Sequence, residues 1–126
     1  MDNDTSPTKE KSHAFAVRIV RLVQWLNTAK KEFVLSKQIL RSGTSIGANL
    51  AEAHAAYSKK EFASKIQISL KEALETSYWL RLLKDTDYID NTAFASIHSD
   101  CVELIKMLTA STKTLKRKAF PKTSNR

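Results

Sequence analysis

Residues 35–52 read LSKQILRSGTSIGANLAE, and this stretch decides the fold. Its apolar and small residues recur at spacings of four and three, the heptad pattern of a helix that packs against other helices. The recurring positions, continued to the next tyrosine, are Ile39, Gly43, Ile46, Leu50, Ala53 and Tyr57. Gly43 and Gly47 lie four residues apart, and each costs about 1 kcal/mol relative to alanine inside a helix. The pattern predicts a helix over residues 33–57 that another backbone approaches closely at the glycines. A local kink or break is the alternative.

Three more segments show the spacing of amphipathic helices, over residues 12–30, 59–84 and 91–119. Ser58 and Glu61 form a capping box at the start of one of them, and Asp90 or Asn91 suits the N-cap of the last. The expected buried residues are Phe15, Ile19, Leu22, Val23 and Leu26, then Phe62, Ile66, Leu70, Ala73, Leu74, Ser77, Leu80 and Leu83, then Phe94, Ile97, Cys101, Leu104, Leu108, Ser111 and Leu115.

Few residues interrupt these segments, because the chain has only two glycines and two prolines. Four amphipathic helices with short connections predict an all-α fold, an antiparallel up-down-up-down four-helix bundle over residues 12–119. A disordered N-terminus (residues 1–11) and a basic disordered tail (residues 120–126) would flank this single domain. Val17, Val20 and Trp25 lie off the main stripe of the first helix, which indicates a second apolar contact, for example with another subunit.

The 126-residue chain has a net charge of +8, which favours an anionic partner such as nucleic acid or a membrane surface. A basic protein whose charge serves only solubility is the alternative. The C-terminal region supplies much of the excess, in Lys113, Lys116, Arg117, Lys118, Lys122 and Arg126. No apolar run approaches the roughly 20 residues of a membrane span, and no signal-peptide core is present. We therefore expect a cytoplasmic protein without a membrane partner.

The polar residues of the 33–57 segment stack along one side of the predicted helix. Lys37, Arg41, Ser45 and Asn49 follow one another at intervals of four, and Glu52 lies slightly off this line. A tight turn at Ser58 brings the next helix back along this face. The expected pairs are Arg41 with Glu75, Ser45 with Lys71, Asn49 with Gln67, and Glu52 with Lys65.

Two interpretations of this polar face remain open. In the first, an Arg41–Glu75 ion pair and an Asn49–Gln67 hydrogen bond set the register of two helices. In the second, the face is a groove for phosphate or base edges, because arginine binds phosphate through two parallel N–H groups. The candidate nucleic-acid-binding residues are Lys37, Arg41, Ser45, Asn49, Lys59, Lys60 and Lys65. The three lysines near the turn are otherwise solvated surface. Stacking on bases is a further role for Trp25, Tyr57, Tyr78 and Trp79, which at helical spacing are more often core or interface.

Catalytic and metal-binding patterns are weak. Di-iron bundles use a Glu-x-x-His motif on each of two helices, and the three histidines here do not supply that pair. No arginine is followed four to six residues later by histidine, as in small helical ribonucleases, and no glycine-rich phosphate loop occurs. Cys101 forms no internal disulfide and reads as a buried small residue. We expect no catalytic residues, metal, cofactor or small-molecule substrate.

The segment Leu35–Ala53 resembles the signature of the four-helix bundle proteins encoded by intervening sequences in bacterial 23S rRNA genes. The likeness continues in residues 58–62 and 70–80 and covers roughly residues 13–117. The resemblance implies closed rings, typically homopentamers, with a basic polar groove to which nucleic-acid binding is attributed and no established catalysis. It places the groove at Lys37, Arg41, Ser45, Asn49 and Glu52. The chain is also similar to the accessory protein of diversity-generating retroelements, a basic pentamer that works with a reverse transcriptase and RNA.

These observations lead to two hypotheses. The first is a non-enzymatic homo-oligomer that binds nucleic acid, chiefly RNA, through a basic groove. The second is a structural or adaptor ring that recruits a protein partner, with its charge serving solubility or protein contact.

Overall fold

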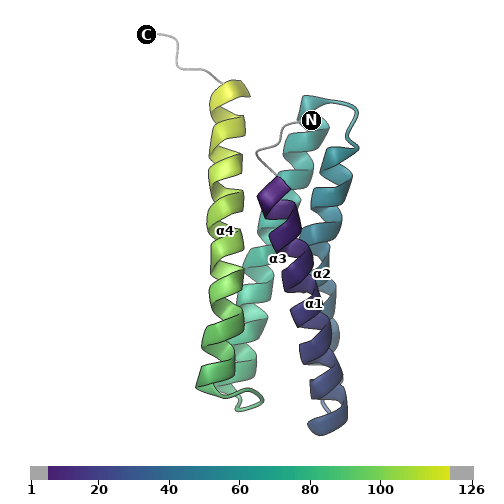
Figure 1. Ribbon diagram of the computed structural model, residues 1–126, viewed down its shortest axis with the longest axis vertical. Coiled ribbons are helices and arrows are strands. Elements are labelled where there is room, and N and C mark those ends of the chain that lie inside the picture. Colours follow the sequence, from purple (N-terminus) through teal and green to yellow (C-terminus); the bar gives the residue numbers. More distant parts are fainter. Residues whose placement is uncertain (1–5, 120–126) are drawn as a thin grey trace.

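A computed structural model describes residues 6–119, which form four helices joined by short turns (Figure 1). The helices are α1 (Ser6–Ala29), α2 (Leu35–His54), α3 (Lys59–Asp85) and α4 (Asn91–Ala119). Over this described range the chain contains no strand, so the predicted all-α four-helix bundle is confirmed. The predictions of disorder for residues 1–5 and 120–126 lie outside the described residues.

Consecutive helices run antiparallel. From Gly43 to Gly47 along α2, the neighbouring residue in α1 falls from Ile19 to Ser12. The same opposed numbering relates α2 to α3 and α3 to α4. α1 also contacts α4, which closes the bundle. In the part of the chain that the structure describes, no helix is both long and apolar enough to cross a membrane.

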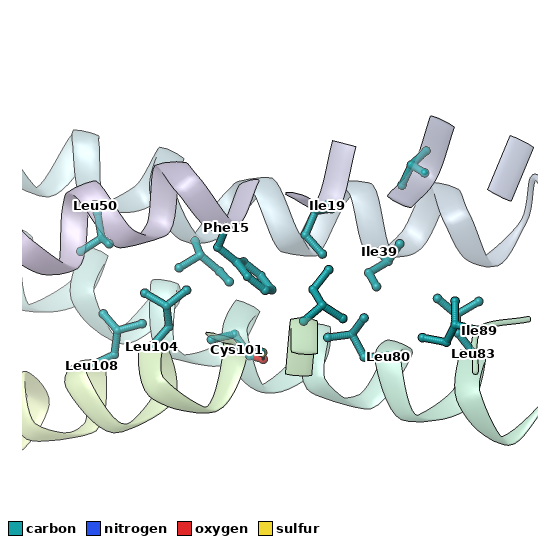
Figure 2. Packing of buried hydrophobic residues seen from close by; sticks show 14 of the residues in the cluster. Phe15, Ile19, Ile39, Leu50, Leu80, Leu83, Ile89, Cys101, Leu104 and Leu108 are labelled. Carbon is teal, nitrogen blue, oxygen red and sulfur yellow. The ribbon is translucent and has the colours of Figure 1, made fainter. Parts of the chain in front are cut away.

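The apolar core runs along the bundle axis and receives side chains from all four helices (Figure 2). Phe15, Ile39, Leu80 and Leu104 are among its fully buried members. Leu74 was wrongly predicted to be buried and is 51% exposed, because it faces away from both neighbours of α3. The helix predicted over residues 33–57 is shorter than expected, because α2 ends at His54, and Tyr57 beyond it is 99% exposed.

α1 begins at Ser6, so the prediction of disorder was wrong for residues 6–11. Their polar side chains are used in packing. Thr8 and Ser12 are buried, and the Ser12 hydroxyl donates to the Lys9 carbonyl at 2.7 Å. Lys11 forms an ion pair with Glu103 of α4 at 2.9 Å. The first turns of α1 are thus held against neighbouring helices despite their polar composition.

The caps of α3 and α4 follow the predicted residues. Ser58 Oγ accepts from the Glu61 amide at 3.0 Å, while the Glu61 carboxylate accepts from the Tyr57 amide rather than that of Ser58. Asp90 is the N-cap of α4, because its carboxylate accepts from the Ala93 amide at 2.8 Å. Both caps satisfy amides that have no partner inside the helix.

The start of α2 is held by a carboxylate that was not predicted from the sequence. Glu32, only 7% exposed, accepts from the amides of three residues at the start of the helix. Burial alone would raise the pKa of this carboxyl, but the backbone hydrogen bonds outweigh burial and lower it. These amides belong to Val34, Leu35 and Ser36. The turn before α2 is therefore tied down by a buried, ionised side chain.

The predicted close approach at the glycines is confirmed, and the partner is α1. A Cβ atom on Gly43 would lie 2.8 Å from Cγ1 of Ile19, whereas one on Gly47 would lie 3.1 Å from Oγ of Ser12. Because α2 is continuous over Leu35–His54, the alternative of a helix break is wrong. The two small residues therefore set the distance between α1 and α2.

We predict that Gly43→Ala destabilises the protein by about 1–2 kcal/mol, because overpacking against the stiff, branched Ile19 outweighs the gain in helix propensity. Gly47→Ala is the matched control and should be close to neutral, because the Ser12 hydroxyl can give way. Thermal unfolding followed by circular dichroism measures both changes. Equal stability of Gly43→Ala and the natural protein would contradict the prediction.

Candidate nucleic-acid interface

Arg41 forms the centre of a charged network between α2 and α3. Its guanidinium donates to the two carboxylate oxygens of Glu72, at 3.2 and 3.4 Å, and to Glu75. Glu75 also accepts from the indole N–H of Trp79 at 2.9 Å. The predicted Arg41–Glu75 pair is confirmed. Glu72 is a second partner, and its signal in the sequence is its position one turn before Glu75 on the same helix face.

The network holds its groups in their charged forms. The hydrogen bond from Trp79, followed by that from Arg41, lowers the pKa of the Glu75 carboxyl. The pKa of Arg41 is raised, first by its hydrogen bond to Glu75. Although 49% of the Arg41 side chain is exposed, its charge faces two carboxylates. A phosphate approaching Arg41 would therefore meet a site with excess negative charge.

The other polar residues of this face are also engaged. Ser45 donates to the Arg41 carbonyl at 2.6 Å, and Asn49 donates to the Ser45 carbonyl at 2.9 Å, so both bond within α2. The Asn49 amide thus uses its own helix where we predicted a bond to Gln67. Lys65 pairs with Glu52 at 2.6 Å, as predicted. The geometry therefore favours the register-setting interpretation of the α2 face.

Buried hydroxyl groups add inter-helix hydrogen bonds that the sequence analysis missed. Thr76 donates to Ser42 Oγ at 2.9 Å, and Ser69 donates to the Ile46 carbonyl at 2.8 Å. All three hydroxyl-bearing residues are buried. Satisfied buried polar pairs of this kind specify one register of α2 against α3.

Three of the predicted nucleic-acid-binding residues have free charge. Lys37, Lys59 and Lys60 are exposed, and no ion pair involves them among residues 7–118. Lys37 lies on α2, whereas the other two begin α3. The structure therefore separates the predicted set into bonded residues on the α2 face and three unpaired lysines, of which Lys37 lies near the start of α2 and Lys59 and Lys60 lie at the α2–α3 turn.

A groove of about 600 Å³ lies between α1 and α4. Its apolar lining includes Val17 and Trp25, which are 44% and 42% exposed. Arg18 crosses one part of it to Asp100 at 2.7 Å. The residues predicted to form a second apolar strip on the first helix therefore do not share one surface. Val17 and Trp25 line this groove, whereas Val20 is exposed outside it. The sequence showed that these residues lie off the main stripe but not that α4 flanks them.

Groups with catalytic potential are sparse in the described part of the chain. No cluster of three or more His, Cys, Asp or Glu residues is placed to hold a metal ion there. Ser77 Oγ lies 2.9 Å from His98 Nε2, and burial, followed by the charges of Arg81 and Lys84, lowers the pKa of His98. Cys101 is buried as predicted, and burial raises the pKa of its thiol to about 12. Such a thiol is a poor nucleophile.

The helices and their polar faces define a basic four-helix bundle. A family model described as 23S rRNA-intervening sequence protein matches residues 6–110, and the chain belongs to this family. One similar solved structure is a protein of unknown function from the S23 ribosomal protein family of Bacteroides thetaiotaomicron VPI-5482. The two are 52% identical with a TM-score of 0.86, over 87% of this chain and 98% of that chain. A comparison with curated proteins finds no match. The family resemblance that we drew from the sequence is thereby confirmed.

We predict that Arg41→Gln lowers the stability at pH 7 by about 0.5–1 kcal/mol, the usual range of partly exposed ion pairs. Glu75 has a lowered pKa, so its ionised form contributes stability above its ordinary pKa of 4.5 and loses it as the pH falls through the lowered value. The difference between variant and natural protein should therefore shrink towards pH 3. Urea unfolding at several pH values measures it, with Lys37→Gln as the control. A difference that does not change with pH would argue against the pairing.

Proposed function

We propose that this protein is a non-enzymatic, cytoplasmic homo-oligomer that binds RNA. The observation that carries the proposal is the set of exposed lysines without ion pairs, Lys37, Lys59 and Lys60, in a chain of net charge +8. Free surface cations attract the phosphate backbone, whereas paired ones contribute little. Membership of a family described by an rRNA intervening sequence supports RNA as the polyanion. Arg41, Ser45, Asn49 and Lys65 would act mainly by shaping the bundle beside these lysines.

The α1/α4 groove supports the oligomeric part of the proposal. Large apolar side chains exposed beside a groove are typical of surfaces that another protein covers. Trp25 and Val17 have this position. The resemblance to ring-forming relatives favours a homopentamer in which a second copy covers this groove. The same groove supports the second candidate function, an adaptor ring that recruits a different protein.

The RNA-binding proposal predicts binding that weakens steeply with salt, because each phosphate contact releases counterions. Fluorescence anisotropy with a labelled RNA at about 50 and 200 mM salt measures the effect. We expect a loss of about tenfold or more across this range. Absence of binding at the lower salt, or binding that salt does not change, would refute the proposal and leave the adaptor function.

The predicted oligomer is tested by measuring the mass of the protein in solution. The chain has a mass of 14.2 kDa, and light scattering coupled to size exclusion should give a multiple of it at micromolar concentration. Trp25→Gln should shift the protein towards the monomer, because the oligomer would bury a polar amide in an apolar contact. Leu74→Gln is the matched control, because Leu74 is 51% exposed outside the groove. A monomeric natural protein would contradict the prediction.

A further inference from the structure

Unpaired positive charge gathers at one end of the bundle. The α2–α3 turn and the C-terminal end of α4 lie at the same end (Figure 1). In antiparallel α3 and α4, the Cys101 thiol donates to the Ala73 carbonyl. Counting the same number of residues from this contact towards the start of α3 and towards the end of α4 places Lys59 level with Leu115. We define the basic end as Lys59, Lys60, Lys113, Lys116, Arg117 and Lys118.

The basic end has little negative charge to balance it. All six side chains are exposed, and none takes part in an ion pair with an acidic residue of the 7–118 range. The opposite end of the bundle is different, because acidic residues accompany its lysines. There Lys84 pairs with Asp85, and Asp87 and Asp90 follow in the turn before α4. The excess charge is therefore concentrated at the basic end.

Helix stability explains only part of this arrangement. Lys116, Arg117 and Lys118 occupy the last turn of α4, where positive charge complements the helix dipole. Lys59 and Lys60 occupy the first turn of α3, where the dipole makes positive charge unfavourable, and Glu61 is the only acidic residue in that turn. Two cations at this unfavourable position point to an anion outside the chain.

An aromatic side chain stands beside these lysines. Tyr57 is 99% exposed and lies in the α2–α3 turn, two residues before Lys59. It therefore leaves its ring free for a flat partner. Aromatic rings next to a basic surface stack on the bases of single-stranded nucleic acid, whereas paired bases are not accessible for stacking.

We infer that an unpaired strand of RNA binds across the basic end, with its phosphates on the six cations and a base stacked on Tyr57. This inference rests on the proposed RNA-binding function and moves its site. The α2 face would contribute little, because Arg41 faces Glu72 and Glu75 and Lys65 faces Glu52. The site would therefore lie at the turn between α2 and α3 and at the end of α4.

The test compares two double variants that remove the same charge. Lys59→Gln/Lys60→Gln alters the basic end, and Lys71→Gln/Lys106→Gln removes two exposed, unpaired lysines from α3 and α4 away from that end. Anisotropy with a labelled single-stranded RNA should show a loss of about tenfold for the first variant and less than about twofold for the second. The slope of log affinity against log salt should fall by about 0.7 for each lost phosphate contact. Thermal unfolding confirms that the variants remain folded.

Further arms test the strand and the aromatic contact. Tyr57→Leu should weaken single-strand binding by about 5- to 150-fold, the range expected for one base stack. Duplex RNA should bind more weakly than the single strand and should not respond to Tyr57→Leu. If Lys71→Gln/Lys106→Gln loses as much affinity as the basic-end variant, the inferred site is wrong although RNA binding stands. If the natural protein binds no RNA at low salt, the proposed function fails as well.

Discussion

The close approach of α1 to α2 at Gly43 is the constraint on which the rest of the structure depends. The Ile19 side chain of α1 occupies the space that a side chain at residue 43 would need, so it packs directly against the backbone of α2. This contact commits one side of α2 to α1. The polar side of the same helix is then turned towards α3, where Ser42 receives the buried hydrogen bond from Thr76. A heptad helix with two glycines thus has one partner on each side and one register for both.

The position of α2 between α1 and α3 explains how charge is distributed over the molecule. Because α2 and α3 lie side by side, carboxylates on α3 reach the basic residues of α2, and Arg41 meets Glu72 and Glu75. Across this face Arg41 and Lys65 are paired, whereas Lys37 and Lys71 form no ion pair within residues 7–118. The cations at the α2–α3 turn and at the end of α4 form no ion pair within residues 7–118. The surface suited to a polyanion is therefore set by where the helices stop.

The pairing of α1 with α4 differs in character from the other pairings. It is marked by ion pairs of Arg18 with Asp100 and Lys11 with Glu103 at its edge. Between these helices the groove leaves the Trp25 ring partly exposed. A bundle closed tightly on three sides and loosely on the fourth presents an apolar face at one definite place. Such a face is suited to contact with another protein chain.

The sequence by itself determined the four helices, most of the core and the family. Apolar periodicity acts locally, so Ile39, Leu80 and Leu104 could be assigned to the interior from spacing alone. The fold-back at Ser58 also predicted the pairs of Arg41 with Glu75 and Glu52 with Lys65, because antiparallel neighbours share one register. Tertiary structure decided the rest. Residues 6–11 are helical with Thr8 buried and Lys11 paired with Glu103 of α4, and the exposure of Leu74 depends on where α2 and α4 lie around α3. Whether a lysine is free or paired depends on its distance from carboxylates on other helices. The spacing of residues within one helix does not predict that distance.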